Sequence, residues 1–269
     1  MSALLSVENL EIRTADRVLV SGVSFSLAAG ERIGLIGESG SGKSLTALAV
    51  LGLLPPAMRA SGSILLDGRQ VIGARDRDLV PLRGSSIAAV FQEPMTALDP
   101  LMRIGDQVGE AVRRRALRDG EKLPKGEVRA RTAELLERVA LPEPQRIARA
   151  FPHGISGGQR QRAAIAMALA CRPKLLVADE PTTALDVTTQ AEILKLLHAL
   201  VRDEGMGLLF ISHDLPVVAT IAERALVMRQ GELIEQGPVA ALFNRPAHAY
   251  TQGLVAAARA FDAALEMTP

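Results

Sequence analysis

The stretch that decides the fold is "GESGSGKS", residues 37–44, which matches the pattern G-x-x-x-x-G-K-[S/T]. It follows the apolar run "ERIGLIG" (31–37), which predicts a buried strand. It opens "KSLTALAVLGLL" (43–54), which predicts a helix that two prolines terminate. A strand, a glycine-rich turn and a helix in this order are the context that a phosphate-binding loop requires, and they argue against a chance glycine-rich turn.

The residue types within this stretch suit a nucleoside triphosphate. Its glycines let the backbone curl so that N–H groups point at phosphate oxygens, and the helix N-terminus adds positive potential. Lys43 would reach the β- and γ-phosphates, and the Ser44 hydroxyl would hold Mg²⁺. The predicted nucleotide-binding residues of this segment are Gly37, Glu38, Ser39, Gly40, Ser41, Gly42, Lys43, Ser44 and Thr46.

A second apolar run, "KLLVADE" (174–180), ends in the adjacent carboxylates Asp179 and Glu180. Charged groups at the carboxyl edge of a buried parallel strand lie where α/β sheets bind ligands. Asp179 suits the Mg²⁺ shell through water, and Glu180 suits polarising the water that attacks the γ-phosphate. The alternative is a solvated loop after a core strand. Together with the phosphate loop, the pair predicts an ATP or GTP hydrolase, without saying what hydrolysis drives.

The remaining segments predict an α/β chain. Short β-prone runs within residues 4–27 indicate a small, partly antiparallel sheet, and "GLLFISHD" (207–214) is typical of a parallel strand covered on both faces. The middle, about 95–155, is charged and has helical spacing in "EVRARTAELLERVALP", so we expect an inserted helical segment there. A tail helix, packed on its own domain or on a partner, is indicated by a stripe formed by Leu254, Ala258, Phe261 and Leu265.

Composition narrows the class of protein. The 269-residue chain is 48% hydrophobic, so it can bury a substantial core, and its net charge of +1, single tyrosine and lack of tryptophan argue against nucleic-acid binding. Cys171 is the only cysteine, which excludes an intramolecular disulfide, argues against cysteine-ligated zinc and fits a reducing compartment. Without a signal-peptide pattern or a membrane-length apolar run, we expect a soluble chain that can dock on a membrane protein. We interpret one basic cluster as a solvated helix face: Arg113, Arg114, Arg115 and Arg118.

The stretch "ISGGQRQR" (155–162) raises a separate question. Ser156 followed three residues later by Gln159 fits a capping box, which predicts a helix start. Gly157 and Gly158 would then occupy the first turn, where glycine costs conformational entropy. Glycines there leave the helix N-terminus bare, so that a phosphate can approach its N–H groups.

With this stretch, the chain resembles the ATP-binding cassette family, whose ATPase subunits carry a signature usually written LSGGQ. Ile155 replaces the usual leucine. Gln92 in "FQEP" resembles the glutamine loop, "ALD" (184–186) resembles the loop that crosses the dimer interface, and His213 in "ISHD" resembles the switch histidine. The resemblance implies a P-loop NTPase fold with a RecA-like core and an N-terminal antiparallel β subdomain (1–94 and 160–240), an inserted α-helical subdomain (95–159) and a C-terminal tail helix (241–269).

The resemblance also implies a mechanism in which two such subunits pair head to tail. Each nucleotide would lie between the phosphate loop of one subunit and the signature of the other, formed by Ser156, Gly157, Gly158 and Gln159 with Asp186. Gln92 would join Ser44 and Asp179 near Mg²⁺ and link the γ-phosphate to the helical subdomain, which contacts a transmembrane partner. His213 would contact the γ-phosphate, Lys43 would bind the phosphates, and Glu180 would act as general base.

A finer resemblance is to the ATPase subunits of bacterial oligopeptide, dipeptide and nickel importers. It rests on "GESGSGKSLTALAVLGLLP", "FQEPMTALDPLMRIGDQV", "ADEPTTALDV" and the tail "LFNRPAHAYTQGL". It implies import of peptides, nickel or a metal chelate at the cytoplasmic face of the inner membrane. The implied partners are a second, usually different, ATPase chain (a homodimer remains open), two permease subunits and an extracytoplasmic binding protein.

Two departures from that group affect ligand expectations. Near "EIRTADR", where relatives place an aromatic residue against adenine, this chain has Arg13, Thr14 and Arg17. No cysteine follows "AHAYTQGL", so no iron–sulfur cluster is expected.

Two other functions are open to a chain with these motifs. A soluble cassette protein acting on ribosomes or DNA would commonly carry two cassettes or a long coiled coil, whereas this chain has one signature and no sustained heptads. A non-hydrolysing cassette is disfavoured by Lys43, Glu180 and His213.

Overall fold

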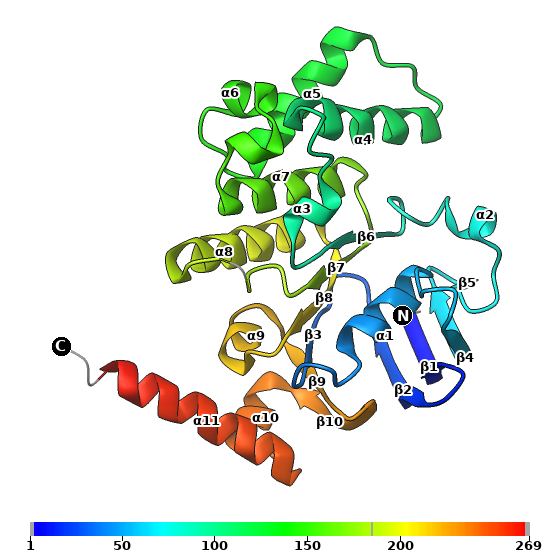
Figure 1. Ribbon diagram of the computed structural model, residues 1–269, viewed down its shortest axis with the longest axis vertical. Helices are drawn as coiled ribbons and strands as arrows, with labels where there is room; N and C mark the ends of the chain where they lie inside the picture. The colour runs from blue at the N-terminus through cyan, green and yellow to red at the C-terminus, as the bar shows by residue number, and fades with distance from the viewer. Residues whose placement is uncertain (1–2, 184, 267–269) are drawn as a thin grey trace. The chain divides into compact units, whose positions relative to one another are not determined.

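The computed structural model describes residues 3–183 and 185–266, and it describes side chains up to residue 260 (Figure 1). The chain forms two compact units. Unit 1 combines the residues up to Leu79 with those from Gly207 onward, and unit 2 is Val80–Met206. The predicted α/β class is confirmed, because both units combine strands and helices. The subdomain boundaries expected from the sequence stay a prediction.

Unit 1 contains the expected antiparallel sheet near the N-terminus. Its strands are β1 (Leu5–Arg13), β2 (Val18–Leu27), β4 (Arg59–Leu66) and β5 (Arg69–Gln70), in the order β2-β1-β4-β5. Apolar side chains alternate with polar ones along β1, and its apolar residues are buried. One face of this sheet therefore forms a hydrophobic core.

A second set of strands in unit 1 is largely parallel. Strand β3 (Arg32–Ile36) pairs in parallel with both β8 (Gly207–Ser212) and β9 (Arg224–Arg229), and β10 (Glu232–Pro238) pairs antiparallel with β9. All of β8 is buried, as its continuous apolar run predicts. The parallel strands place their carboxyl ends at one edge, where the phosphate loop begins.

Helices of unit 1 are α1 (Lys43–Leu51), α2 (Asp76–Leu79), α9 (Leu215–Ile221), α10 (Val239–Asn244) and α11 (Ala249–Glu266). Helix α11, drawn in red in Figure 1, contacts α9.

The sequence prediction that the helix after the phosphate loop continues to Leu54 was wrong at its end. Gly52 adopts a left-handed φ of 64° and its N–H bonds back to the Ala49 carbonyl, which ends α1 before the two prolines. In the tail, the side chains of Phe261 and Leu265 lie outside the described residues, so the predicted stripe stays a prediction.

Unit 2 joins two parallel strands to a group of helices. Strands β6 (Ile87–Val90) and β7 (Leu175–Asp179) pair in parallel. The expected helical middle is confirmed, and Figure 1 shows it in green. The helices of unit 2 are α3 (Pro94–Ala97), α4 (Ile104–Arg118), α5 (Lys125–Arg138), α6 (Pro144–Arg149), the 3₁₀ turn η1 (Pro152–Gly154), α7 (Gly157–Ala170) and α8 (Val187–Glu204).

The basic cluster on α4 is only partly the solvated face that we expected. Arg113 and Arg114 are exposed and pair with Glu110. Arg115 donates to the Cys171 carbonyl at 2.7 Å, and Arg118 donates to the backbone carbonyl of residue 83 at 2.7 Å. Two of the four arginines therefore hold α4 to the backbone of neighbouring segments.

None of the described helices combines the length and the apolar character that crossing a bilayer needs.

Candidate functional site

The phosphate loop has the backbone geometry that its glycines predict. Gly40 and Gly42 adopt φ values of 79° and 101°, in the left-handed region that favours glycine. A Cβ atom on Gly37 would lie 2.2 Å from the Met228 carbonyl oxygen, so that position has no room for a side chain. Helix α1 starts directly after Gly42, and no side chain caps its N-terminus. The first N–H groups of α1 are therefore not taken by a capping side chain.

Lys43 is folded over the loop. Its side chain is buried, and Nζ donates to the carbonyl oxygens of Gly37 at 2.7 Å and Glu38 at 2.9 Å. These bonds hold the ammonium group at the loop, where it adds a positive charge to the peptide N–H groups. The arrangement suits a polyanionic ligand.

Hydroxyl groups near the loop differ in their surroundings. The Ser41 hydroxyl is buried, and among the described residues it has no hydrogen-bond partner, whereas Ser44 is exposed in the first turn of α1. A buried orphan hydroxyl beside uncapped N–H groups fits a phosphate ligand. Thr46 is fully buried and donates to the Gly42 carbonyl at 2.9 Å, so it supports the loop from the helix side. Its predicted role toward the nucleotide stays a prediction.

Unit 1 brings His213 to the same sheet edge as the phosphate loop. Strands β3 and β8 are parallel, and Ile36 is paired with Ser212. The phosphate loop starts at the residue after Ile36, and His213 is the residue after Ser212, so both lie at the same edge of the sheet. His213 is exposed, and Asp214 beside it donates its N–H to the Ser212 hydroxyl at 3.0 Å and caps α9. This edge is where parallel α/β sheets bind ligands.

The sequence did not predict one contact of the loop. The Glu38 N–H donates to the Tyr250 hydroxyl of α11 at 3.0 Å. In the sequence, Tyr250 belongs to the tail "AHAYTQGL", which marks the family resemblance but predicts no contact with the loop.

The predicted acidic pair occupies the end of β7 in unit 2. Asp179 is buried at the last position of the strand, and Glu180 follows it with a φ of 48°. A left-handed glutamate is uncommon and indicates a backbone held by its surroundings. The Thr183 hydroxyl donates to Glu180 Oε2 at 3.0 Å, which fixes the direction of that carboxylate.

Gln92 reaches the same edge of unit 2 as the acidic pair. Strands β6 and β7 are parallel, and Val90 is paired with Ala178. Gln92 lies two residues after Val90, and Glu180 lies two residues after Ala178, so the two side chains belong to the same edge. Gln92 is exposed. The Gln161 side chain of α7 is buried and donates to the Phe91 carbonyl at 3.5 Å, the limit of a hydrogen bond. It connects α7 with the segment that carries Gln92.

The predicted capping box of the signature is confirmed. Ser156 caps α7: its hydroxyl accepts from the Gln159 N–H at 3.3 Å, and the Gln159 side chain accepts from the Ser156 N–H at 3.0 Å. The two glycines differ. A Cβ on Gly158 would lie 2.5 Å from Thr189 Cγ2, whereas one on Gly157 would meet only Leu185 Cδ2 at 3.6 Å.

Asp186 lies beside the signature. It caps α8 by accepting the Thr189 N–H at 3.0 Å, and Thr189 is the residue that packs on Gly158. The hydrogen bond from the Thr189 backbone lowers the pKa of Asp186 below its usual value. Ala184 of the predicted "ALD" loop lies outside the described residues.

The predicted site residues thus form two groups, each ordered within its own unit. Unit 1 brings the phosphate loop and His213 together. Unit 2 brings Gln92 to the same edge as Asp179 and Glu180, and the signature to Asp186. Near the expected adenine position, Thr14 and Arg17 close the turn between β1 and β2 by mutual backbone and hydroxyl bonds.

Comparisons with known proteins agree with this geometry. A family profile described as "ABC transporter" matches residues 20–183. The peptidoglycan transport ATP-binding protein YejF of Agrobacterium fabrum is 50% identical over 260 residues, which cover 94% of this chain and 47% of that protein. The oligopeptide transport ATP-binding protein OppD of Escherichia coli is 44% identical over 265 residues, which cover 97% of this chain and 77% of that protein.

Among solved structures, the dimeric post-hydrolysis state of the ATP-binding cassette MJ0796 bound to ADP and Pi is similar, with a TM-score of 0.77 and 28% identity. The match covers 87% of this chain and 98% of that one. The chain spans about half the length of several curated relatives that it matches.

Proposed function

Because the chain belongs to the ABC transporter family, we propose that it binds and hydrolyses ATP as a subunit of an importer for peptides or a related small solute. The observation that carries the proposal is the uncapped phosphate loop with Lys43 over it and His213 at the same edge. Relatives named for oligopeptide and peptidoglycan transport support a peptide-like cargo; nickel or a metal chelate is the alternative cargo. We place the subunit at the cytoplasmic face of the inner membrane.

In this proposal the chain's own residues divide the chemistry between them. The loop N–H groups and Lys43 bind the phosphates. Ser44, Gln92 and Asp179 would hold Mg²⁺, which would supply positive charge to neutralise the phosphates. Glu180 takes a proton from the attacking water, with its carboxylate direction set by Thr183. His213 contacts the γ-phosphate.

A second cassette subunit completes the arrangement. Ser156, Gly157, Gly158 and Gln159 would face the nucleotide held by the partner's loop, with Asp186 beside them. The exposed N-terminus of α7, with Gly157 open to close approach, supports this role. The two cassettes would be different chains, as in the importers that this sequence resembles.

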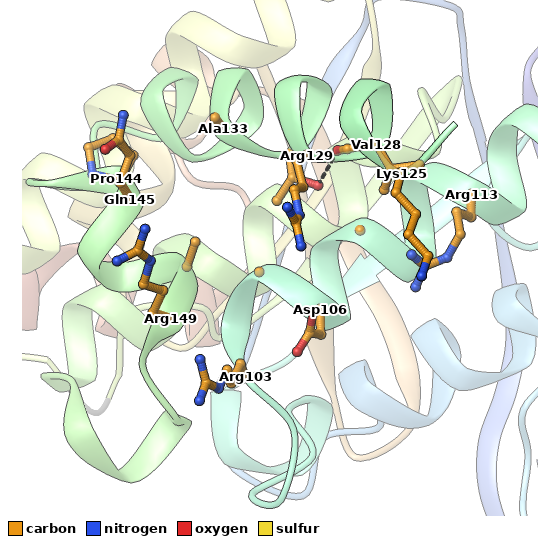
Figure 2. Close-up of a pocket in the computed structure, with 14 residues that line it drawn as sticks. Arg103, Asp106, Arg113, Lys125, Val128, Arg129, Ala133, Pro144, Gln145 and Arg149 are labelled. Carbon is orange, nitrogen blue, oxygen red and sulfur yellow. Dashed lines mark hydrogen bonds between the residues drawn. The ribbon is translucent and has the colours of Figure 1, made fainter. Parts of the chain in front are cut away.

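A cavity in the helical part of unit 2 supports docking of a membrane partner. It measures about 680 Å³ and lies among α4, α5 and α6. Figure 2 shows cationic side chains around it, with Asp106 as the acidic residue of the lining. We propose that an acidic cytoplasmic segment of a permease subunit binds here, by charge complementarity. The basic lining residues are Arg103, Arg113, Lys125, Arg129 and Arg149.

The docking proposal is tested by co-purification with the permease. Arg129→Gln should weaken it, whereas Arg131→Gln, on the same helix but outside the cavity lining, should not. Equal retention of the permease by both variants would refute the docking site.

The transport function is tested by ATP hydrolysis in the intact complex with its binding protein. We expect stimulation by a member of a panel of peptides, nickel and metal chelates. Hydrolysis that no member of the panel changes, together with co-sedimentation with ribosomes, would overturn the transport function.

The assignment of Glu180 as general base predicts that Glu180→Gln lowers hydrolysis by about 10²–10⁴-fold with nucleotide binding retained. Hydrolysis at the parent rate would refute that assignment.

A further inference from the structure

We propose that Tyr250, on the C-terminal helix α11, is a positioning residue for the phosphate loop. Its hydroxyl oxygen accepts a hydrogen bond from the Glu38 N–H at 3.0 Å, across 212 positions of sequence. Glu38 is the first residue of the loop after Gly37. The inference rests on the proposed nucleotide-binding function, and it extends that function to a segment beyond the strand, loop and helix of the phosphate site.

Glu38 is held from both of its backbone groups. Its N–H donates to Tyr250, and its carbonyl oxygen accepts from Lys43 Nζ at 2.9 Å and from the Ser41 N–H at 3.2 Å. The orientation of Glu38 therefore helps to position the Lys43 ammonium, together with the Gly37 carbonyl, and holds the turn of the loop at Ser41. A hydrogen bond that fixes the Glu38 N–H acts on both.

The tyrosine ring is itself held in place. The guanidinium of Arg229, at the end of β9, lies 5.0 Å from the ring centroid in a cation–π contact. Two residues further on, the Gly231 N–H donates to the Ser41 carbonyl at 3.1 Å. The turn after β9 thus contacts the loop directly at Ser41, and the last residue of β9 contacts it indirectly through the tyrosine ring. Burial raises the pKa of Tyr250, so the hydroxyl stays neutral at physiological pH.

Hydrogen bonds connect the start of α11 to strand β10, and they hold the segment that carries Tyr250. Glu235 of β10 accepts the N–H groups of Ala247 at 2.8 Å and His248 at 3.0 Å. His248 Nδ1 in turn accepts the Tyr250 N–H at 3.0 Å. These bonds connect β10, the turn before α11 and the tyrosine in one chain of contacts. Displacement of α11 would therefore be transmitted to the phosphate loop.

The decisive variant is Tyr250→Phe, which keeps the ring and its contact with Arg229 but removes the hydroxyl. We expect its Kd for ATP, measured on the full chain by displacement of a fluorescent nucleotide, to rise about three- to tenfold, the size of one lost hydrogen bond. In the transport complex, KM for ATP should rise by a similar factor while kcat changes less than twofold. The matched control is Gln252→Ala, which removes a bond from the same helix to Pro246 without touching the loop.

A spectroscopic readout separates positioning from mere packing. The chain has one tyrosine and no tryptophan, so its intrinsic fluorescence reports on Tyr250 alone. We expect ATP with Mg²⁺ to change that fluorescence in the full chain, with half-saturation at the Kd for ATP. A packing role alone would lower the melting temperature of Tyr250→Phe, leave its Kd for ATP unaltered, and leave the fluorescence of the parent chain unchanged by ATP with Mg²⁺; that result would overturn the inference. If the parent chain bound no ATP, the proposed function would fail, and this inference with it.

Discussion

The phosphate loop and the signature segment are both glycine-rich turns that lead into a helix, yet they are built differently. In the loop, the residue before α1 is Gly42 with a φ of 101°, and no side chain caps the helix. In the signature, the residue before α7 is Ser156 in an extended conformation, within a complete capping box. The first turn of α1 thus lacks a side-chain cap, whereas the first turn of α7 is capped by side chains of the signature itself.

This difference suits the two segments to different roles in the proposed nucleotide site between two subunits. The loop adds a lysine whose ammonium group bonds to the loop carbonyls, so it supplies both charge and a backbone cradle. The signature supplies only a helix end, and one of its glycines is needed for packing on Thr189. The signature therefore suits contact with a phosphate that is already bound by the phosphate loop of a partner subunit.

The largest expected effect comes from the loop cation. Lys43→Met keeps the aliphatic stem but removes the charge, and we expect ATP affinity of the full chain to fall about 10- to 100-fold, because charge-assisted hydrogen bonds are lost. Gln159→Ala in the signature should change that affinity less than twofold. If a nucleotide-displacement assay showed the same loss of ATP affinity for Lys43→Met and Gln159→Ala, the proposed difference between the two segments would be wrong.

The two signature glycines provide the next test. Gly158→Ala places a Cβ against Thr189, and we expect the free energy of unfolding to fall by about 1–3 kcal/mol in denaturant titration. Gly157→Ala should leave the free energy of unfolding unchanged or raise it by up to about 1 kcal/mol, because its Cβ makes an ordinary contact and alanine loses less conformational entropy than glycine. The same variant should slow hydrolysis in the assembled transporter. Adding Thr189→Ala to Gly158→Ala should restore stability. If both single variants were equally stable, the packing argument would be wrong.

A smaller effect is expected from pH. The pKa of Asp186 is lowered because its carboxylate accepts the Thr189 N–H, so its stabilisation is present above the unfolded-state pKa of about 3.9 and is lost as pH falls through the folded value. Asp186→Asn also caps helices but does not titrate. The melting temperatures of parent and variant should therefore diverge at neutral pH and converge in acid. A constant difference across that range would contradict the assigned cause.

Much of the fold could be predicted because its signals are local. The phosphate loop, the parallel strands, the capping box of Ser156 and Gln159 and the helical middle all follow from short-range patterns. The contact between Tyr250 and Glu38 could not, because it joins positions 212 apart and depends on how α11 lies on β10. Likewise, nothing in the spacing of "SGG" distinguishes Gly157 from Gly158, since the difference comes from Thr189 on another helix.

The central claim is that the signature acts on a nucleotide that this chain's own loop does not hold. The most direct measurement is ATP affinity and ATP hydrolysis of Ser156→Arg, the former in the isolated chain and the latter in the intact transporter. The account predicts parent-like affinity in the isolated chain and loss of most hydrolysis in the assembly. Hydrolysis at the parent rate in the assembly, or lost affinity in the isolated but folded chain, would contradict it.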